Sequence, residues 1–98
     1  MLIVLAQIKI KPETKEEFLK ITKPLIAKSR AEPGCISYSL YESTEKENAY
    51  MMVEQWRSEE IFDKHVASDH FKSFGIAGGP LFAEELDIKI YKTDCECQ

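Results

Sequence analysis

Two histidines are the residues of this chain best suited to move a proton near neutral pH. His65 and His70 are its only histidines, and an unperturbed imidazole titrates at about pH 6.5. His65 follows apolar residues of a predicted helix, so we expect its side chain to face the interior. There it could act as a catalytic acid or base, or it could be a buried histidine bonded to a carbonyl or carboxylate. His70 stands near a second helix start, where it could serve catalysis or only pack. Five residues turn about 140° on a continuous helix, and no third ligand is evident nearby in sequence, so we predict no metal site.

Three further side chains could form a pocket around His65. Trp56, the only tryptophan, either lines that pocket or anchors the core or a dimer interface. Glu54 lies two residues earlier on the same strand face. A carboxylate among apolar groups needs a partner, so we expect Glu54 to orient His65 or to pair with an arginine. Tyr38 could give its hydroxyl to a substrate oxygen or simply pack its ring.

Two more residues complete the expected substrate pocket. Gln7, on the first strand, offers an amide that could polarise a carbonyl. Phe74 lies on a predicted helix that also carries Phe71. The following glycine-rich stretch, residues 75–80, has no Gly-Lys-Ser/Thr and no preceding strand, so it is not a phosphate loop. We predict a loose segment there, either a helix break or a flexible cover.

Charge and cysteine content exclude several classes of protein. The 98 residues carry 13 Lys and Arg against 17 Asp and Glu, a net charge of −4, which disfavours binding to nucleic acid or to an acidic membrane. No apolar run approaches the roughly 20 residues that span a bilayer. Cys35, Cys95 and Cys97 make a poor disulfide framework, and the first residues resemble a strand more than a signal peptide. We therefore expect a cytoplasmic protein, and the role of Cys95 and Cys97 stays open.

Hydrophobic periodicity predicts four strands and three helical segments. Strands are expected at 2–10, 35–42, 49–57 and 86–91, where side chains alternate with period two. Thr14 stands three residues before Glu17, a capping-box pattern that opens a helix ending at Pro33-Gly34, with a kink or break at Pro24. Ser58 is a good helix start, and Ser68-Asp69 restarts a helix.

The order of these elements predicts an α+β fold. Strand, helix, strand, strand, helix, strand is the ferredoxin-like split βαβ sandwich, an antiparallel four-stranded sheet with helices on one face. We expect one domain over residues 1–98, with residues 93–98 as a mobile tail. An apolar patch on the uncovered face is unusual for a monomer, so we predict a homodimer in which a second copy covers this face and a cavity remains between sheet and helices. The expected members of that patch are Ile3, Leu5, Tyr50, Met52 and Trp56.

Four parts of the chain carry recognisable motifs: residues 29–35, Tyr38, residues 54–58 and residues 65–71, where Glu-x-Trp at a strand end precedes His-x-x-Ser-x-His-Phe. Together they resemble the antibiotic biosynthesis monooxygenase family, whose members form dimeric α/β barrels and include small quinol monooxygenases. The resemblance runs along the chain apart from its tail. It implies His65 as the acid or base and a pocket shaped by Trp56 and Tyr38.

The resemblance also implies a reaction without metal or flavin. An electron-rich phenol or quinol loses a proton in a dry pocket, and its anion passes an electron directly to O₂. Gln7 stands near where oxygenase and haem-degrading members often carry Asn, and Phe74-Gly75 occupies the region where haem-degrading members carry a proximal histidine. These departures weaken the polyketide and haem interpretations.

Two functional hypotheses follow from the sequence. The first is a cofactor-independent monooxygenase of a quinol or small phenolic compound, acting as a homodimer on a quinone-like molecule and O₂. The second is a non-oxygenase protein on the same barrel, either a small-molecule binding or detoxification module or an isomerase of a small carbonyl compound. The identity of the substrate stays open.

Overall fold

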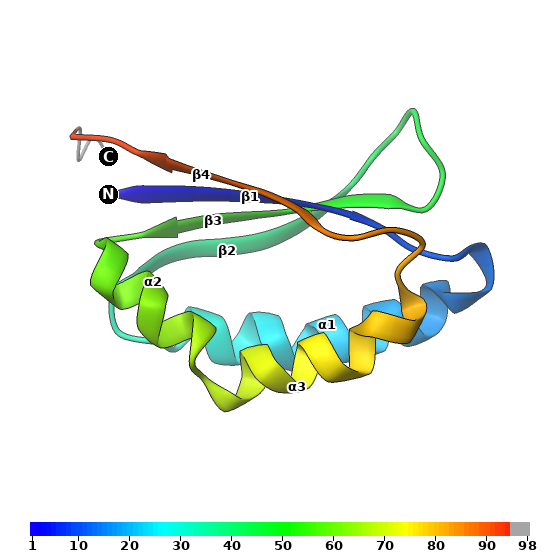
Figure 1. The fold of residues 1–98 in the computed structure, drawn as a ribbon, viewed down its shortest axis with the longest axis horizontal. Helices are drawn as coiled ribbons and strands as arrows, with labels where there is room; N and C mark the ends of the chain where they lie inside the picture. Colours follow the sequence, from blue (N-terminus) through cyan, green and yellow to red (C-terminus); the bar gives the residue numbers. More distant parts are fainter. Residues whose placement is uncertain (95–98) are drawn as a thin grey trace.

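The fold is a single four-stranded sheet with helices packed on one of its faces (Figure 1). The computed structural model describes residues 1–94. Within them the elements are β1 (Leu2–Lys9), η1 (Pro12–Thr14), α1 (Lys15–Arg30), β2 (Cys35–Glu42), β3 (Ala49–Trp56), α2 (Glu59–Val66), α3 (Asp69–Gly78), η2 (Gly79–Leu81) and β4 (Asp87–Lys92). None of these helices is long and apolar enough to cross a membrane.

The strand order confirms the predicted topology. The sheet runs β2-β3-β1-β4 and every neighbouring pair is antiparallel, as a ferredoxin-like α+β fold requires. Helices α1 and α3 lie side by side beneath the sheet and α2 lies beneath the end of β3, while the opposite face stays open (Figure 1). The N-terminus and the end of β4 lie together, because Met1 and Thr93 exchange two hydrogen bonds. Of the predicted tail, residues 93–98, the structure describes Thr93 and Asp94, whereas Cys95 and Cys97 lie outside the described residues.

The pairing of β1 with β3 decides which residues face the helices. Leu2 pairs with Trp56 and Ala6 with Met52, and directly paired residues share a face of the sheet. Trp56 and Met52 are therefore buried beneath the sheet, as is Tyr50. The prediction that these three side chains lie on the open face was wrong. The apolar residues of β1 and β3 on the open face are Ile3, Leu5, Met51 and Val53.

Helix α1 differs from its predicted start and interior. Thr14 makes no side-chain cap; its hydroxyl donates to the carbonyl of Lys11 at 2.7 Å, inside the preceding turn η1. The expected capping box is therefore absent. The helix also runs without a break through Pro24, which lies on the exposed side. Its buried residues are Phe18, Thr22, Leu25 and Ser29.

The starts of the two shorter helices are confirmed, whereas the end of the second differs from its prediction. Ser58 and Ser68 do cap α2 and α3, accepting hydrogen bonds from the amides of Ile61 and Phe71. The segment predicted to be loose, residues 75–80, is instead helical: α3 continues to Gly78 and η2 begins at Gly79.

The last strand is less buried than expected. Ile88 and Ile90 do pair with helix-side residues of β1, yet each is almost half exposed. Their strand, β4, forms the edge of the sheet, so it has a neighbouring strand on one side only.

Candidate active site

The turn after α1 places a carboxylate against the two helices that follow β3. The amides of Glu32 and Cys35 donate to the carbonyls of Ser29 and Glu32, closing two successive tight turns. Gly34 has φ +88°, a left-handed conformation that glycine adopts without strain. A Cβ on Gly34 would lie 2.7 Å from Ile61 of α2. This turn therefore packs closely on α2 and holds Glu32 beside it.

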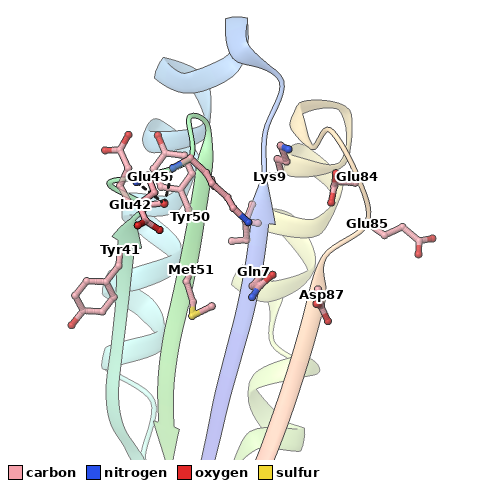
Figure 2. Close-up of a pocket in the computed structure, with 14 residues that line it drawn as sticks. Gln7, Lys9, Tyr41, Glu42, Glu45, Tyr50, Met51, Glu84, Glu85 and Asp87 are labelled. Carbon is pink, nitrogen blue, oxygen red and sulfur yellow. Dashed lines mark hydrogen bonds between the residues drawn. The ribbon is translucent and has the colours of Figure 1, made fainter.

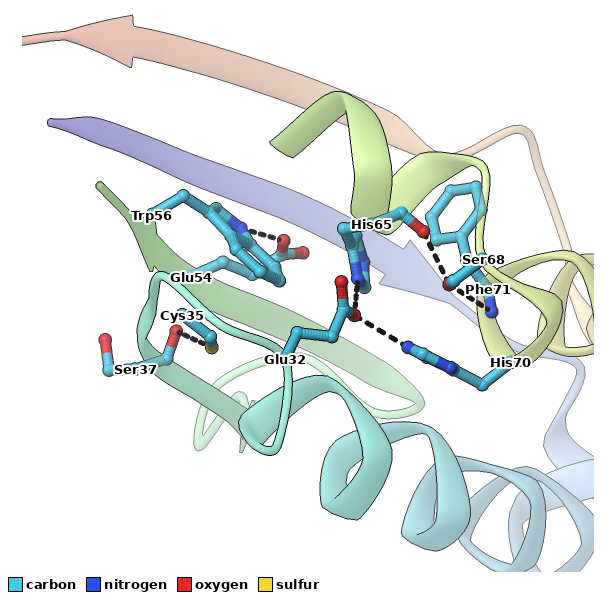
Figure 3. Close-up of polar contacts among 9 residues, drawn as sticks. All are labelled: Glu32, Cys35, Ser37, Glu54, Trp56, His65, Ser68, His70 and Phe71. Carbon is cyan, nitrogen blue, oxygen red and sulfur yellow. Dashed lines mark hydrogen bonds and ion pairs between the residues drawn. The ribbon is translucent and has the colours of Figure 1, made fainter. Parts of the chain in front are cut away.

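The break between α2 and α3 brings the two histidines together. Helix α2 ends at Val66, and the Ser68 hydroxyl donates to the carbonyl of His65 at 2.6 Å while accepting from the amide of Phe71. The chain turns at this point, so the angle of a continuous helix does not apply. His65 and His70 both face Glu32 (Figure 3).

One oxygen of Glu32 contacts both imidazoles. Glu32 Oε2 lies 2.7 Å from His65 Nδ1 and 2.6 Å from His70 Nε2. A carboxylate accepts and cannot donate, so the ring nitrogens that face it carry the protons. His65 is fully buried, whereas the side chains of Glu32 and His70 are 14% and 16% exposed.

The other nitrogen of His65 is the unusual atom of this cluster. His65 Nε2 is buried and has no hydrogen-bond partner among the described residues. With Nδ1 donating to Glu32, the neutral ring has an unprotonated Nε2 with a free lone pair. Burial lowers the pKa of His65, against the hydrogen bond and charge of Glu32, which raise it. The ring is therefore neutral at neutral pH and available as a base.

Aromatic rings surround His65 and explain its desolvation. The ring centre of Trp56 lies 4.5 Å from that of His65, followed by Phe71 at 5.1 Å, Tyr38 at 5.4 Å and Phe62 at 6.0 Å. These rings come from β3, α3, β2 and α2. An apolar shell of this kind disfavours the charged imidazolium.

Trp56 joins His65 to a second buried titratable group. Its Nε1 donates to Glu54 Oε1 at 2.9 Å (Figure 3). Burial raises the pKa of Glu54 to about 7, and the charge of Glu32 adds to this, while the bond from Trp56 opposes it. Glu54 therefore bonds Trp56 in place of the expected His65 or arginine, and the partner that orients His65 is Glu32.

The remaining predicted pocket residues are spread over the molecule. Tyr38 is buried, its ring lies edge-on to Trp56, and burial raises the pKa of its hydroxyl. Gln7 is exposed on the open face, where it lines a cleft of about 480 Å³ (Figure 2). Phe74 packs on Phe18 and Phe82 and, with His70, lines a second cleft of about 370 Å³ between α1 and α3. Neither cleft reaches His65.

Glu32 is the site residue that the sequence interpretation missed. It stands 33 positions before His65, in a turn next to Pro33 and Gly34, where a charged residue is ordinary. Only its place inside the motif-bearing segment 29–35 distinguished it. In the described part of the chain, Glu32, His65 and His70 also form the one group of possible metal ligands, with donor atoms within 4.8 Å of one another. The distances from Glu32 Oε2 to the two imidazole nitrogens are those of direct hydrogen bonds. We therefore assign these contacts as hydrogen bonds and not as shared metal ligation.

Comparison with known proteins assigns this chain to a family. The family model described as antibiotic biosynthesis monooxygenase matches residues 1–75. The chain belongs to the antibiotic biosynthesis monooxygenase family. The match covers β1 through most of α3, and so includes Glu32, Glu54, Trp56, His65 and His70.

Individual proteins resemble this chain along most of its length. An uncharacterized protein of Synechocystis is 41% identical over 93% of this chain, and the chain spans 62% of that relative's length. A Bacillus subtilis protein named "Putative monooxygenase YcnE" is 39% identical over 90% of this chain and 93% of its own. The crystal structure of a conserved protein from Methanosarcina mazei superimposes with a TM-score of 0.91 at 34% identity, covering 95% of this chain and 92% of that one.

Proposed function

We propose that this protein is a cofactor-independent monooxygenase that oxidises a quinol or small phenolic compound with O₂. Membership of the family and the name of the Bacillus subtilis relative support a monooxygenase-like activity. The observation that carries the proposal is the buried, unpartnered Nε2 of His65. Glu32 accepts a hydrogen bond from the opposite ring nitrogen, Nδ1, and aromatic rings enclose the imidazole. General-base chemistry on an aromatic substrate needs such an arrangement.

The proposed reaction begins with one proton transfer. His65 Nε2 takes the hydroxyl proton of the quinol, and the carboxylate of Glu32 stabilises the imidazolium that forms. The quinolate then gives one electron to O₂, and the resulting radical pair combines at a ring carbon. Loss of water leaves a hydroxyquinone. One oxygen atom enters the product and the other leaves as water, with all four electrons supplied by the quinol.

Substrate must reach a ring nitrogen that is buried. The two clefts described above do not include His65, so in this proposal the surrounding side chains move to admit the substrate. Phe62 and Phe71 are the partly exposed members of the aromatic shell. A dry site then forms around the substrate as these rings close over it.

Oxygen uptake with a panel of reduced quinones tests the proposal. We expect uptake above the autoxidation blank, and a loss of at least about 100-fold in His65→Ala, the usual scale for removing a general base. Lys64→Ala is the matched control, because Lys64 precedes His65 on α2 and is exposed; it should retain full activity. Uptake equal to the blank for every quinol, or unchanged in His65→Ala, would contradict the proposal.

A specific observation favours one other function, isomerisation of a small carbonyl compound on the same site. Burial lowers the pKa of His65 and raises that of Glu54 to about 7, so one dry region holds a neutral base beside a carboxyl group that is partly protonated near neutrality. An isomerase needs such a pair to remove a proton and return it. Exchange of substrate hydrogen for deuterium in D₂O without O₂ consumption would select this function.

A further inference from the structure

Glu32 contacts both histidines through one oxygen, so it can do more than hold the His65 ring in place. We propose that Glu32 is the positioning residue of His65, holding its Nε2 free of a proton, and that His70 sets the proton affinity of His65 by competing for the same carboxylate oxygen. This proposal extends the role of His65 given above. Only its consequence for catalysis rests on the proposed function. The geometry behind it is the shared oxygen, 2.7 Å from one ring and 2.6 Å from the other.

Exposure separates the roles of the two histidines. His65 is fully buried, while His70 lines the cleft between α1 and α3 and so meets solvent. A proton from solvent therefore reaches His70 without entering the aromatic shell. When His70 is positively charged, two effects oppose a positive charge on His65. The two like charges repel each other, and His70 binds the same Glu32 oxygen more strongly.

The other titratable groups near His65 are less suited to set its proton affinity. Tyr38 faces it from β2, and burial keeps that hydroxyl protonated by raising its pKa. Glu54 of β3 reaches it through Trp56. Cys35, beside Glu32, is a neutral thiol because burial raises its pKa to about 11.

The two partners act on His65 with opposite sign. The hydrogen bond and charge of Glu32 raise the pKa of His65, whereas the charge of His70 lowers it. Substituting one partner should therefore move the titration of His65 down, and substituting the other should move it up. A merely structural role would produce no such opposition.

Nitrogen-15 NMR of both imidazoles through a pH titration of the full chain tests this proposal. In the unsubstituted protein we expect neutral His65 to carry its proton on Nδ1. Glu32→Gln should lower the proton affinity of His65 about tenfold or more, the scale of a lost charged hydrogen bond, and populate the Nε2–H form. Glu32→Asp should recover part of the loss, and His70→Gln should raise the affinity. Ser73→Ala, in the same cleft as His70, should change neither quantity.

Three results would overturn the proposal. They are an Nε2–H tautomer in the unsubstituted protein, shifts of the same sign in Glu32→Gln and His70→Gln, or a chelatable divalent cation that replaces the protons on both rings. The tautomer and the His70→Gln shift need no Glu32 variant, so a failure of Glu32→Gln to fold leaves the test intact. Oxygen uptake distinguishes this proposal from the proposed monooxygenase function. If the NMR shifts are as expected but no oxygen is consumed, only the monooxygenase function is contradicted.

Discussion

At the scale of single residues, the site is unusual because it buries ionisable groups in an aromatic interior. Glu54 is 5% exposed, and the hydrogen bond to its carboxylate comes from a neutral indole. A buried carboxylate with so little support favours its protonated form. The free energy of folding must therefore depend on the pH at which this carboxyl ionises.

Glu54 should make the protein less stable as pH rises from 4.5 to about 7. Its pKa rises from 4.5 to about 7 on folding, so between those values the folded chain binds more protons than the unfolded chain and stability falls. The loss is complete above about pH 7 and is on the order of 3 kcal/mol. Glu54→Gln keeps an acceptor for Trp56 and removes the titration.

Urea unfolding at pH 5 and pH 8 measures this effect. The unsubstituted protein should lose more stability between these pH values than Glu54→Gln does, because other titrating groups are common to both. Equal losses in the two proteins would show that Glu54 ionises normally in the folded state.

At the scale of elements, a turn and a helix break assemble the site. The turn 31–34 carries Glu32 to α2, and the break after Val66 turns His70 toward the same carboxylate. Gly34 is the tightest point of this arrangement, since it combines a left-handed backbone with a close approach to Ile61. The positions of Glu32 and α2 are thus coupled through one glycine.

Gly34→Ala should destabilise the protein by roughly 1–3 kcal/mol. A residue with a Cβ is strained in this backbone region, and its methyl group would also meet Ile61. Gly75→Ala is the matched control: Gly75 lies within α3, and a methyl group added there would meet no atom within 4 Å, so alanine should stabilise the helix by about 0.5–1 kcal/mol. Chemical denaturation of both variants compares them, and a neutral or stabilising Gly34→Ala would contradict the account of the turn.

At the scale of the whole molecule, the sheet has one covered face and one open face. Ile3, Leu5, Met51 and Val53 lie on the open face without a helix over them. Tyr91 of the edge strand joins them by pairing with Ile3 and is half exposed. We propose that a second copy of the chain covers this face, since contiguous apolar surface of this kind marks an interaction site.

Light scattering after size exclusion should therefore give twice the mass of one chain. Leu5→Arg places a charge in the centre of the open face and should shift the protein toward monomer, because an unpaired charge is costly to bury. Leu19→Arg makes the same change on α1, where Leu19 is already exposed, and should leave the dimer intact. A monomer in the unsubstituted protein, or equal effects of both variants, would contradict this arrangement.

Local patterns in the sequence were enough to predict the elements and their order. Period-two alternation located the strands, and Ser58 and Ser68 marked the starts of α2 and α3. Such signals work because caps and periodicity involve residues that are neighbours in the chain. The motif around Trp56 and His65 likewise identified the family.

Only the tertiary structure decided which face of β3 is buried and what supports His65. Both faces of β3 are apolar, so alternation alone cannot choose between Met52 and Met51; pairing with β1 chooses. Glu32 is 33 residues from His65, and no local pattern links them. The sequence by itself determined the strands, helices and family of this protein, whereas long-range packing determined the carboxylate that turns a buried histidine into a candidate base.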